Sequence, residues 1–574
     1  MLFPPASRRF HVAICLSTLL VCGTPFLTPP VMAAPKTVLS LSDFGARPNS
    51  GADATPAFQA AFAAVAKHPE GAVLRIPKGR YDLFPAQASK RPCFASNATE
   101  SNSDGTRTIA LDLRSLKNLS IEGNGSLLMM RGNMTLLVAE NCENLTVSNL
   151  AFDFLRPTVS ELTIREKGDG FFTAQIHPDS KYEIVNGNSI RWIGEGWTRS
   201  HNLWQIFDPT TERVWRAGNP LANMKKIEQI GPGLLRFEPA QLTSLQVGQV
   251  LQGRDTTRDQ VGMWLNHSKN LTLRDVKIHF MAGFGLLSQF SENLNFERLQ
   301  VAPAPQSGRT CAVAADVLHF SGCKGRITVR DSLLSAANDD ALNVHGTHLR
   351  IIEKPAPNQI LVRFMHPQTW GFQAYFPGDE VSFVHPDTMK NFGDTKVLAA
   401  EMKSPREQLL TLAAPIPAEV VLNSDCLENT TWTPSVEVTN CDIKHIPTRG
   451  FLLTSRRPLL IQNNRFFRTN DPAILVENDA SGWYESGPVR DLTIKNNSFI
   501  QCGEPAIDIH NRNHSGIKII GNTFTLKDDR AIRAIGVAGL HLSNNTVKIK
   551  PTPLFDTTES SAVMLKDNSI TLAP

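Results

Sequence analysis

The chain has 574 residues, of which 58 are Lys or Arg and 54 are Asp or Glu. This near balance of charge gives no reason to expect nucleic acid as a partner. The nine cysteines, seven of them after residue 33, lack paired CxxC spacing, which excludes a disulfide scaffold and a cysteine zinc site.

Residues 1–33 have the features of a signal peptide. Arg8 and Arg9 precede an apolar run from His11 to Val21, and small residues follow at the end of the segment. The run is shorter than the roughly 20 residues that span a bilayer, so a retained membrane anchor is the weaker alternative. We expect an exported protein, periplasmic or secreted, with no membrane span in the mature chain.

Residues 34–155 are predicted to form an N-terminal cap and the first coils of a repeat. Thr55 is expected to cap an amphipathic helix that places Phe58, Ala61, Phe62 and Val65 on one face. Such a helix would cover the open end of a repeat and so protect it from aggregation.

Short segments of alternating apolar residues, each followed by Asn, Asp or Gly, recur along the chain. The alternation predicts short strands, and the terminal Asn or Gly predicts tight turns with left-handed backbone. A period near 23 residues predicts a solenoid, and the leucine pattern of leucine-rich repeats is missing. We therefore expect an all-β fold, a right-handed parallel β-helix. The 23-residue spacing links Leu271 to Leu294, Val438 to Ile461, and Ile519 to Leu542.

Two stretches interrupt the period, at 156–262 and 349–432, and both contain strand-like runs between Gly, Pro and Asp turns. Each is long enough for an inserted β-barrel-like domain. Solenoid coils are then expected at 263–348 and at 433–574. The second insertion has an aromatic segment around Trp370 that is a candidate for stacking on a sugar, although the core of the barrel itself is an equal alternative.

Each period also contains a second strand, and polar residues occupy aligned positions in it. A column that changes from apolar to polar is predicted to leave the core and form one wall of a groove. A merely solvated sheet face is the alternative. One column contains His319, Asn343, Leu475 and Asp508, and the column two residues further on contains Ser321, His345, Glu477 and His510.

Three aspartates mark the predicted groove. Asp316 and Asp340 begin two copies of one pattern 24 residues apart, so successive coils would place them at the interstrand separation of roughly 5 Å, with Asp339 beside them. Hydrolysis of a glycosidic bond needs one carboxylic acid and one carboxylate, and neighbouring negative charges raise one pKa while another stays low. The cluster predicts a glycosidase site. Calcium binding is the structural alternative, although the nearby histidines suit sugar hydroxyls better than a hard cation.

The segments ADVLHFSGCKG, NDDALNVHGTHL and FMHPQTWGFQAYFPGDEVSFV resemble glycoside hydrolase family 110, α-1,3-galactosidases built on a β-helix with β-barrel insertions. The resemblance covers essentially the whole chain after the signal peptide, and the expected N-terminal helix resembles the cap of pectate-lyase-like β-helices. It implies an exo-acting, inverting hydrolase that releases terminal α-1,3-linked galactose from α-galactosyl oligosaccharides or glycoconjugates, such as blood-group B glycans. The acidic residues of the family correspond by motif to Asp316, Asp339 and Asp340.

As a hypothesis, Asp316 is the general acid, while Asp339 and Asp340 hold and deprotonate water. Inversion predicts a carboxylate separation of roughly 6.5 to 9.5 Å, whereas one near 5 Å would indicate retention. No cofactor and no metal are expected. Asn343 has a second interpretation as part of an internal asparagine ladder. The candidate substrate-binding residues are His319, Asn343, His345, Trp370, Arg449, Glu477 and Asn478.

Two other functions stay open. A polygalacturonase-like pectin hydrolase shares the β-helix and the aspartates, but the chain lacks a GHG or RIK element and a basic groove for an anionic substrate. A non-catalytic carbohydrate-binding β-solenoid is the other alternative, because fold alone does not establish activity. Binding does not require three mutually repelling acids, which favours an enzyme. The sequence leaves open the preference for branched or linear glycans and whether a homo-oligomer forms.

Overall fold

The computed structural model describes residues 37–100, 103–241, 244–510, 513–527, 530–549 and 555–572. The signal peptide expected at residues 1–33 lies outside this range. Within the described range, no helix has both the length and the apolar character to cross a membrane.

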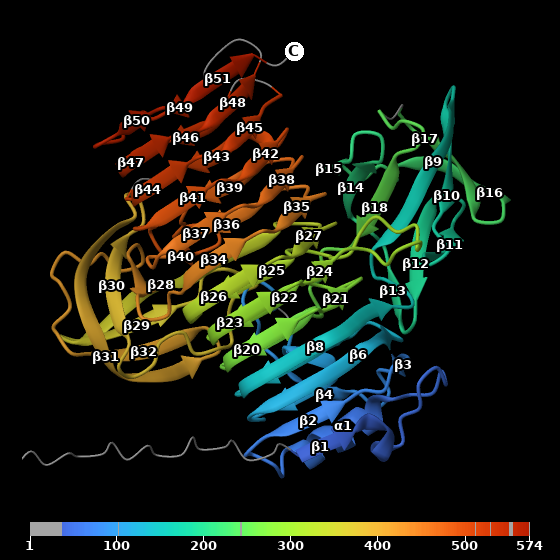
Figure 1. Cartoon of the computed structure of the whole chain (residues 1–574), viewed down its shortest axis with the longest axis horizontal. Helices are drawn as coiled ribbons and strands as arrows, with labels where there is room; N and C mark the ends of the chain where they lie inside the picture. Colours follow the sequence, from blue (N-terminus) through green and yellow to red (C-terminus); the bar gives the residue numbers. More distant parts are fainter. Residues whose placement is uncertain are drawn as a thin grey trace, which may run out of the picture. The chain divides into compact units, whose positions relative to one another are not determined.

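The predicted parallel β-helix is confirmed. Strands stack in sequence order, and almost all of them pair in parallel with the strand of the next coil (Figure 1). The register matches the spacing of the sequence, because Leu271 lies opposite Leu294 and Val438 lies opposite Ile461. Three sheets result. Two long strands, β6 (Leu119–Met130) and β8 (Glu143–Phe154), belong to both the first and the second.

The first sheet contains β1 (Thr37–Ser40), β2 (Ala72–Arg75), β6 (Leu119–Met130), β8 (Glu143–Phe154), β20 (Lys269–Arg274), β23 (Glu292–Glu297), β26 (Lys324–Arg330), β34 (Ser435–Thr439), β37 (Leu459–Gln462), β41 (Leu492–Lys495), β44 (Ser515–Ile520), β47 (Ala538–Ser543) and β50 (Met564–Lys566). The second sheet adds β3 (Arg80–Leu83), β21 (Lys277–Ile278), β24 (Gln300–Val301), β27 (Leu333–Ser335), β35 (Asp442–Lys444), β38 (Arg465–Phe467), β42 (Ser498–Ile500), β45 (Thr523–Thr525), β48 (Thr546–Ile549) and β51 (Ser569–Leu572).

The third sheet carries the polar columns. It contains β4 (Ser89–Pro92), β5 (Thr106–Arg114), β7 (Thr135–Glu140), β19 (Met263–Asn266), β22 (Leu286–Gln289), β25 (Leu318–Ser321), the first part of β28 (Leu342–Ala356), β36 (Phe451–Leu453), β39 (Pro472–Val476), β43 (Gly503–Ile509), β46 (Ile532–Ala534) and β49 (Phe555–Asp556). The short strand β40 (Glu485–Ser486) pairs antiparallel with β28.

The turns and the interior explain why the period holds. Asn440, Asn463 and Asn496 have φ values of 56° to 57°, the left-handed conformation predicted for the turn asparagines. Inside, Phe499 stacks on the equivalent phenylalanines of both neighbouring coils, Phe466 at 5.0 Å and Phe524 at 4.8 Å between ring centroids. Repetition of one side chain at one position therefore fills the core evenly.

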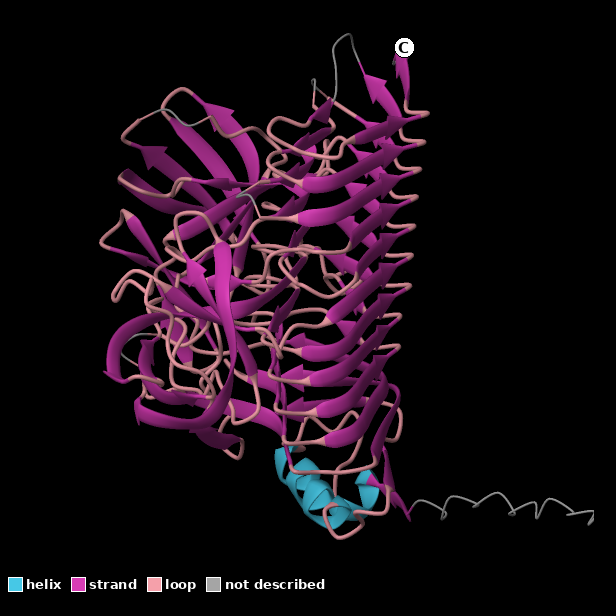
Figure 2. Cartoon of the chain, turned by 90° about the vertical axis from the view of Figure 1, so that its left-hand side faces the viewer, coloured by secondary structure: helices cyan, strands magenta, loops and turns pink. Residues whose placement is uncertain are grey.

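A helix covers the N-terminal end of the stack, as predicted (Figure 2). A 3-10 helix, η1 (Leu41–Phe44), precedes α1 (Thr55–Val65), whose residues Phe58 and Phe62 are buried in the solenoid core. Thr55 is not the N-cap, because the helix already begins with it and its N–H donates to Asp53 Oδ1 at 2.9 Å. Its hydroxyl instead accepts from Phe84 N–H at 3.1 Å, which ties the helix to the first coil.

The two insertions form β domains with cores of their own. The first is a seven-stranded antiparallel sheet joined by a three-stranded sheet, β11 (Lys181–Val185), β12 (Ser189–Gly194) and β13 (Trp197–Arg199). The order of the seven strands is β15 (Arg213–Ala217), β14 (Leu203–Asp208), β18 (Val250–Arg254), β9 (Ser160–Gly168), β10 (Phe171–Ile176), β17 (Leu234–Pro239) and β16 (Met224–Gly231).

The second insertion is a closed antiparallel barrel that begins with the distal part of β28. Because β28 runs from the third solenoid sheet straight into the barrel, the barrel is attached at the coil that follows Asp340. Around the barrel, β28 is followed by β29 (Gln359–Arg363), β32 (Glu407–Leu412), β31 (Lys390–Ser404), β30 (Glu380–His385) and β33 (Cys426–Asn429), which pairs again with β28.

Candidate active site

Asp316 and Asp340 occupy equivalent positions on successive coils, as the 24-residue spacing predicted. Each lies two residues before a strand of the third sheet, and Leu318 pairs with Leu342 in the parallel register. Val317 N–H donates to Asp340 O at 2.9 Å, which fixes the two turns against each other. The side chains are almost fully buried, with residue exposures of 6% for Asp316 and 1% for Asp340.

The predicted column of polar residues is also confirmed by the register. His319 pairs with Asn343, and the column continues through Leu452 and Leu475 to Asp508. His319 and Asn343, the polar residues of this column that lie beside the aspartates, line one pocket. That pocket is lined by Asn97, Arg258, Phe284, Asp316, His319, Asp340, Asn343, Arg449, Leu452, Trp483 and Glu485.

Asp340 is held by an arginine on the next coil. Arg449 Nε donates to Oδ1 at 3.0 Å and Nη2 lies 2.8 Å from Oδ2, while Thr448 Oγ1 donates to Oδ1 at 2.8 Å. Burial raises the pKa of Asp340 to about 7; Arg449 opposes this shift, and the charges of Asp339 and Asp316 add to it. Asp340 therefore titrates near neutral pH.

Asp339 is held by an arginine of the first insertion. Arg216, on β15, places Nη2 2.7 Å from Asp339 Oδ2. Burial acts to raise the pKa of Asp339, but the charges of Arg216, Arg449 and other arginines outweigh it and hold the pKa below its usual range. Because arginines already neutralise Asp339 and Asp340, the cluster does not have the arrangement expected of a calcium site.

Among the described residues, no arginine forms an ion pair with the carboxyl group of Asp316, which is instead joined to a histidine. Its Oδ2 lies 2.7 Å from Nδ1 of His319. Burial, followed by the charge of Asp339, raises the pKa of Asp316 to about 8. At neutral pH the cluster thus combines a protonated Asp316 with an ionised Asp339, and Asp340 lies between them in acidity.

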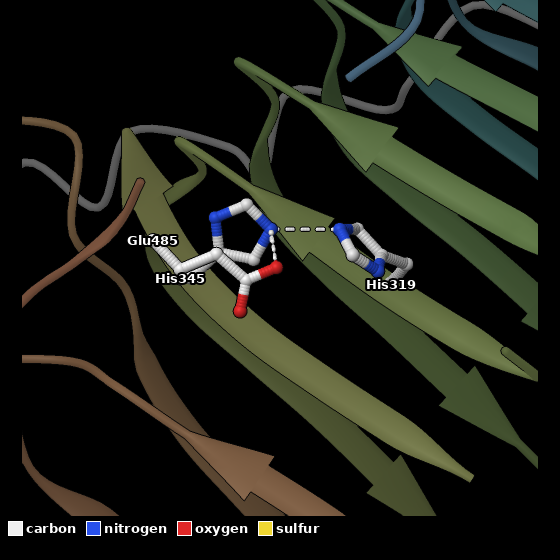
Figure 3. Close-up of side chains that lie close together, drawn as sticks. All are labelled: His319, His345 and Glu485. Atoms are coloured by element: carbon white, nitrogen blue, oxygen red, sulfur yellow. Dashed lines mark hydrogen bonds and ion pairs between the residues drawn. The ribbon is translucent and has the colours of Figure 1, made fainter. Parts of the chain in front are cut away.

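His319, His345 and Glu485 converge (Figure 3), and His319 joins this group to Asp316. The two histidines place their Nε2 atoms 2.7 Å apart, and His345 Nε2 lies 3.5 Å from Glu485 Oε1. Burial lowers the pKa of His319 well below its usual value. Burial acts to raise the pKa of Glu485, but the neighbouring histidines and Arg449 hold it below its ordinary value, so Glu485 is a carboxylate.

These three residues have the donor types that zinc prefers, with ligand atoms within 4.8 Å of one another. Two nitrogen ligands on one tetrahedral zinc, at Zn–N distances near 2.0 to 2.1 Å, lie about 3.3 Å apart. The 2.7 Å between the two Nε2 atoms is shorter than that and is the length of a hydrogen bond. The observed geometry therefore fits a shared proton better than a shared metal ion.

Several predicted substrate-binding residues do not line this pocket. His345 lies behind His319, with Nδ1 bonded to the carbonyl oxygen of Gly346. Trp370 is 8% exposed and packs against Phe94 in the core of the second insertion, so the core alternative describes it and stacking on a sugar does not.

Glu477 and Asn478 also lie away from the pocket. The strand β39 ends at Val476, so the chain leaves the column before these residues. Glu477 Oε2 instead lies 3.9 Å from Nε2 of His510 on the following coil. Asn478 is buried beside residues 386–389 of the second insertion. Asn343 belongs to the pocket and not to an asparagine ladder, since its amide donates to Glu485 at 3.3 Å.

Sequence reasoning missed the residues that close the pocket. Asn97 donates to Glu485 Oε1 at 2.9 Å across 388 positions of the chain, and Trp483 from the same loop as Glu485 is 46% exposed at the rim. One signal was available for this loop: Leu459 pairs with Leu492, so that coil has 33 residues instead of 23. No pattern in the sequence connects Asn97 or Arg258 to the aspartates.

Comparisons with known proteins agree with this architecture. Models of GLAA-B beta-barrel domain I, GLAA-B beta-barrel domain II and the right handed beta helix region match residues 160–251, 359–426 and 426–547. Alpha-1,3-galactosidase A of Bacteroides fragilis is 40% identical over 90% of this chain and 88% of its own length. Alpha-1,3-galactosidase B of Bacteroides thetaiotaomicron is 32% identical over 93% and 88%. Among solved structures, the surface protein and adhesin PfbA of Streptococcus pneumoniae covers 93% of this chain and 97% of its own, at 12% identity and a TM-score of 0.45.

Proposed function

Because this chain belongs to the family of α-1,3-galactosidases A and B, as the sequence resemblance predicted, we propose that it hydrolyses terminal α-1,3-linked galactose from glycans. The reaction is exo-acting and inverting, with Asp316 as the general acid and Asp340 as the general base. One observation carries this proposal: two carboxyl groups of different acidity enter one pocket from successive coils.

Asp316 suits the acid because it keeps its proton at neutral pH. Burial and the nearby charge of Asp339 raise its pKa to about 8, and an acid with a pKa near the working pH donates efficiently. Its Oδ2 is bonded to His319, which leaves Oδ1 for the oxygen of the scissile bond. Protonation of that oxygen allows the aglycone to leave as an alcohol.

Asp340 suits the base because the charge and hydrogen bonds of Arg449 favour its ionised form, and oppose the rise in pKa that burial causes. Arg449 binds both of its oxygens and fixes the carboxylate plane, so that a water molecule can be deprotonated in one direction. Asp339 is not a lining residue of the pocket; its charge, held in place by Arg216, acts to raise the pKa of both other aspartates. Inversion requires roughly 6.5 to 9.5 Å between the acid and base carboxyl groups.

The walls of the pocket support exo action and sugar binding. The hydrogen bond from Asn97 to Glu485 connects two wall segments next to the acids, so the groove does not continue past them as it would for an internal cut. Asn343 Oδ1 has no hydrogen-bond partner among the described residues, although it is buried, and a sugar hydroxyl would satisfy it. Trp483 offers an exposed ring at the rim for the apolar face of a sugar.

An NMR time course with linear Gal-α-1,3-Gal tests the proposal. We expect free galactose, with the β-anomer appearing first, and no new reducing ends from polygalacturonate in a parallel incubation. The Asp316→Asn variant should lose about 10²- to 10⁴-fold in kcat, the range for loss of a general acid. Early α-galactose would overturn inversion, and cleavage of polygalacturonate alone would favour the pectin hydrolase. Binding of the disaccharide without turnover would support the non-catalytic solenoid.

A further inference from the structure

A line of three short hydrogen bonds runs inward from the proposed acid. Asp316 Oδ2 lies 2.7 Å from His319 Nδ1, and His345 Nδ1 lies 2.6 Å from Gly346 O. Between them, the Nε2 atoms of His319 and His345 lie 2.7 Å apart (Figure 3). Both histidines are buried, with exposures of 1% and 2%, and neither ring has room for water between these atoms. The proposed mechanism uses the other carboxyl oxygen of Asp316, Oδ1, and no atom of this line.

The positions of the protons along this line can be deduced from its inner end, at Gly346 O. A carbonyl oxygen only accepts, so His345 Nδ1 carries a proton and donates it to Gly346 O. Only one proton fits between two Nε2 atoms 2.7 Å apart. If it resides on His345, that ring is a cation and His319 Nδ1 donates to Asp316. If it resides on His319, His345 is neutral and Asp316 Oδ2 must itself donate to His319, since burial keeps His319 neutral.

We infer that His319 and His345 are positioning residues that form a proton relay behind Asp316. This inference rests on the proposed role of Asp316 as the general acid. The relay supplies a proton to Oδ2 of Asp316 while Oδ1 gives its own proton to the leaving oxygen.

Three bonds to hydrogen break in this step, and three form. The bonds that break are Asp316 Oδ1–H, His319 Nδ1–H and His345 Nε2–H, and those that form are leaving oxygen–H, Asp316 Oδ2–H and His319 Nε2–H. The substrate gains one proton, and the His345 cation becomes neutral. Asp316 stays uncharged throughout, so no carboxylate is left next to the ionised Asp339. After the products leave, the proton that Asp340 took from the attacking water passes through water in the pocket to Oδ1, and the relay moves back.

The charges around the relay are placed for this purpose. Glu485, 3.5 Å from His345 Nε2, stabilises the cationic form of that ring, and it is itself fixed by Asn97 and Asn343. At the other end the relay faces the aspartate cluster and the two arginines of the pocket, Arg258 and Arg449. Phe284 packs edge-on against His319 at 5.1 Å between ring centroids and excludes water from that side. The proton therefore has one route, along the line.

Comparing the rates on two substrates distinguishes a proton relay from a merely structural role of the two histidines. Hydrolysis of Gal-α-1,3-Gal needs a proton on the leaving oxygen, whereas α-galactosyl fluoride releases a leaving group that needs none. We expect His345→Gln, which keeps a hydrogen-bonding side chain but cannot carry a positive charge, to lower kcat on the disaccharide about 10- to 100-fold. On the fluoride its kcat should change less than about threefold. His319→Gln should show the same selectivity, and His510→Gln, a histidine three coils beyond His345 that does not line the pocket, should change neither rate.

Proton counting gives a second measurement on the same proteins. When kcat on the disaccharide is plotted against the D2O fraction of the solvent, the plot for the unaltered enzyme should be curved, because several protons move together. The plot for His345→Gln should be a straight line. Equal losses of kcat on both substrates in His345→Gln and in His319→Gln would overturn the relay, as would zinc that copurifies with the unaltered enzyme and is removed with its activity by a chelator. Asp316→Asn separates the two hypotheses: if it loses as much on the fluoride as on the disaccharide, the acid assignment itself is wrong.

Discussion

The C-terminal coils and the coils that carry the aspartates share one period but bury polar groups in different ways. In the C-terminal coils a ladder of asparagines runs along the interior. Each asparagine amide donates to the next one and to a backbone carbonyl, and the same acceptor oxygen also receives a backbone N–H. The members of this ladder are Asn464, Asn497, Asn522, Asn545 and Asn568.

The coils that carry the aspartates bury polar groups whose hydrogen-bond partners are not supplied by the same residue type on the next coil. Asp316 and Asp340 differ in their partners although they occupy the same position on successive coils, and those partners come from one histidine and one arginine. The Oδ1 atom of Asn343 has no hydrogen-bond partner in the part of the chain that the structure describes. One backbone register can thus hold either a fully hydrogen-bonded asparagine ladder or a reactive pocket. Which of the two forms depends on whether neighbouring coils repeat the same side chain or change it.

The largest effect should come from a site coil. Asp340→Asn is close in shape to the native residue, but the amide cannot deprotonate water. We expect kcat on Gal-α-1,3-Gal to fall about 10²- to 10⁴-fold, the range for loss of a general base, while circular dichroism and the melting temperature stay close to those of the unaltered protein. The matched control is Asp442→Asn on β35, which should leave kcat unchanged. Normal turnover by Asp340→Asn would remove Asp340 from the mechanism.

A substitution in the asparagine ladder should have the opposite result: the protein should lose stability and keep its kcat. Asn497→Ala removes two donated and two accepted hydrogen bonds at a residue that is 2% exposed, so buried groups of Asn464 and Ile461 lose partners. We expect the free energy of unfolding of these coils to fall by about 3 to 5 kcal/mol, with kcat per folded molecule unchanged.

Urea unfolding and hydrogen exchange of the flanking strands measure this loss of stability. Lys495→Ala on the same coil is the control, and because this residue is exposed its effect should stay within about 0.5 kcal/mol. A change of less than about 1 kcal/mol for Asn497→Ala would show that the ladder does not stabilise the coils.

The site should respond to pH where the ladder, which has no titratable group, does not. Asp340 must be ionised, so kcat/KM should fall as the pH drops below about 7, and Asp316 must be protonated, so kcat/KM should fall as the pH rises above about 8. The expected profile is a narrow bell between these values with about tenfold change per pH unit on either side. Initial rates across pH 5 to 10 test this, and a plateau through that whole range would contradict the paired assignment.

The smallest effect should be at the rim. Trp483→Ala removes an exposed ring that we place against the sugar, and we expect KM to rise about tenfold, equivalent to about 1.4 kcal/mol of contact, with kcat little changed. Trp370→Phe is the counterpart, because that ring lies in the core of the second insertion. It should lower the melting temperature and leave KM alone. If the two variants exchange these effects, the sugar stacks at Trp370 after all.

The sequence by itself determined the period, the register of the coils, the cap helix and the three aspartates on neighbouring coils. These features are local or periodic: strand alternation, turn asparagines and a fixed coil length constrain each residue to lie beside the one about 23 residues away. For this reason the pairing of His319 with Asn343 and of Leu271 with Leu294 could be read from spacing alone.

Only the tertiary structure decided how the aspartates differ. Arg216 reaches Asp339 across 123 positions and Asn97 reaches Glu485 across 388, and neither contact follows from any period. Trp370 went into the core of the inserted barrel because its neighbours there are apolar, and His345 turned behind His319 because Gly346 O fixed its ring. Packing between segments far apart in the chain sets the charge and burial around each carboxyl group, and those two quantities decide which one holds a proton.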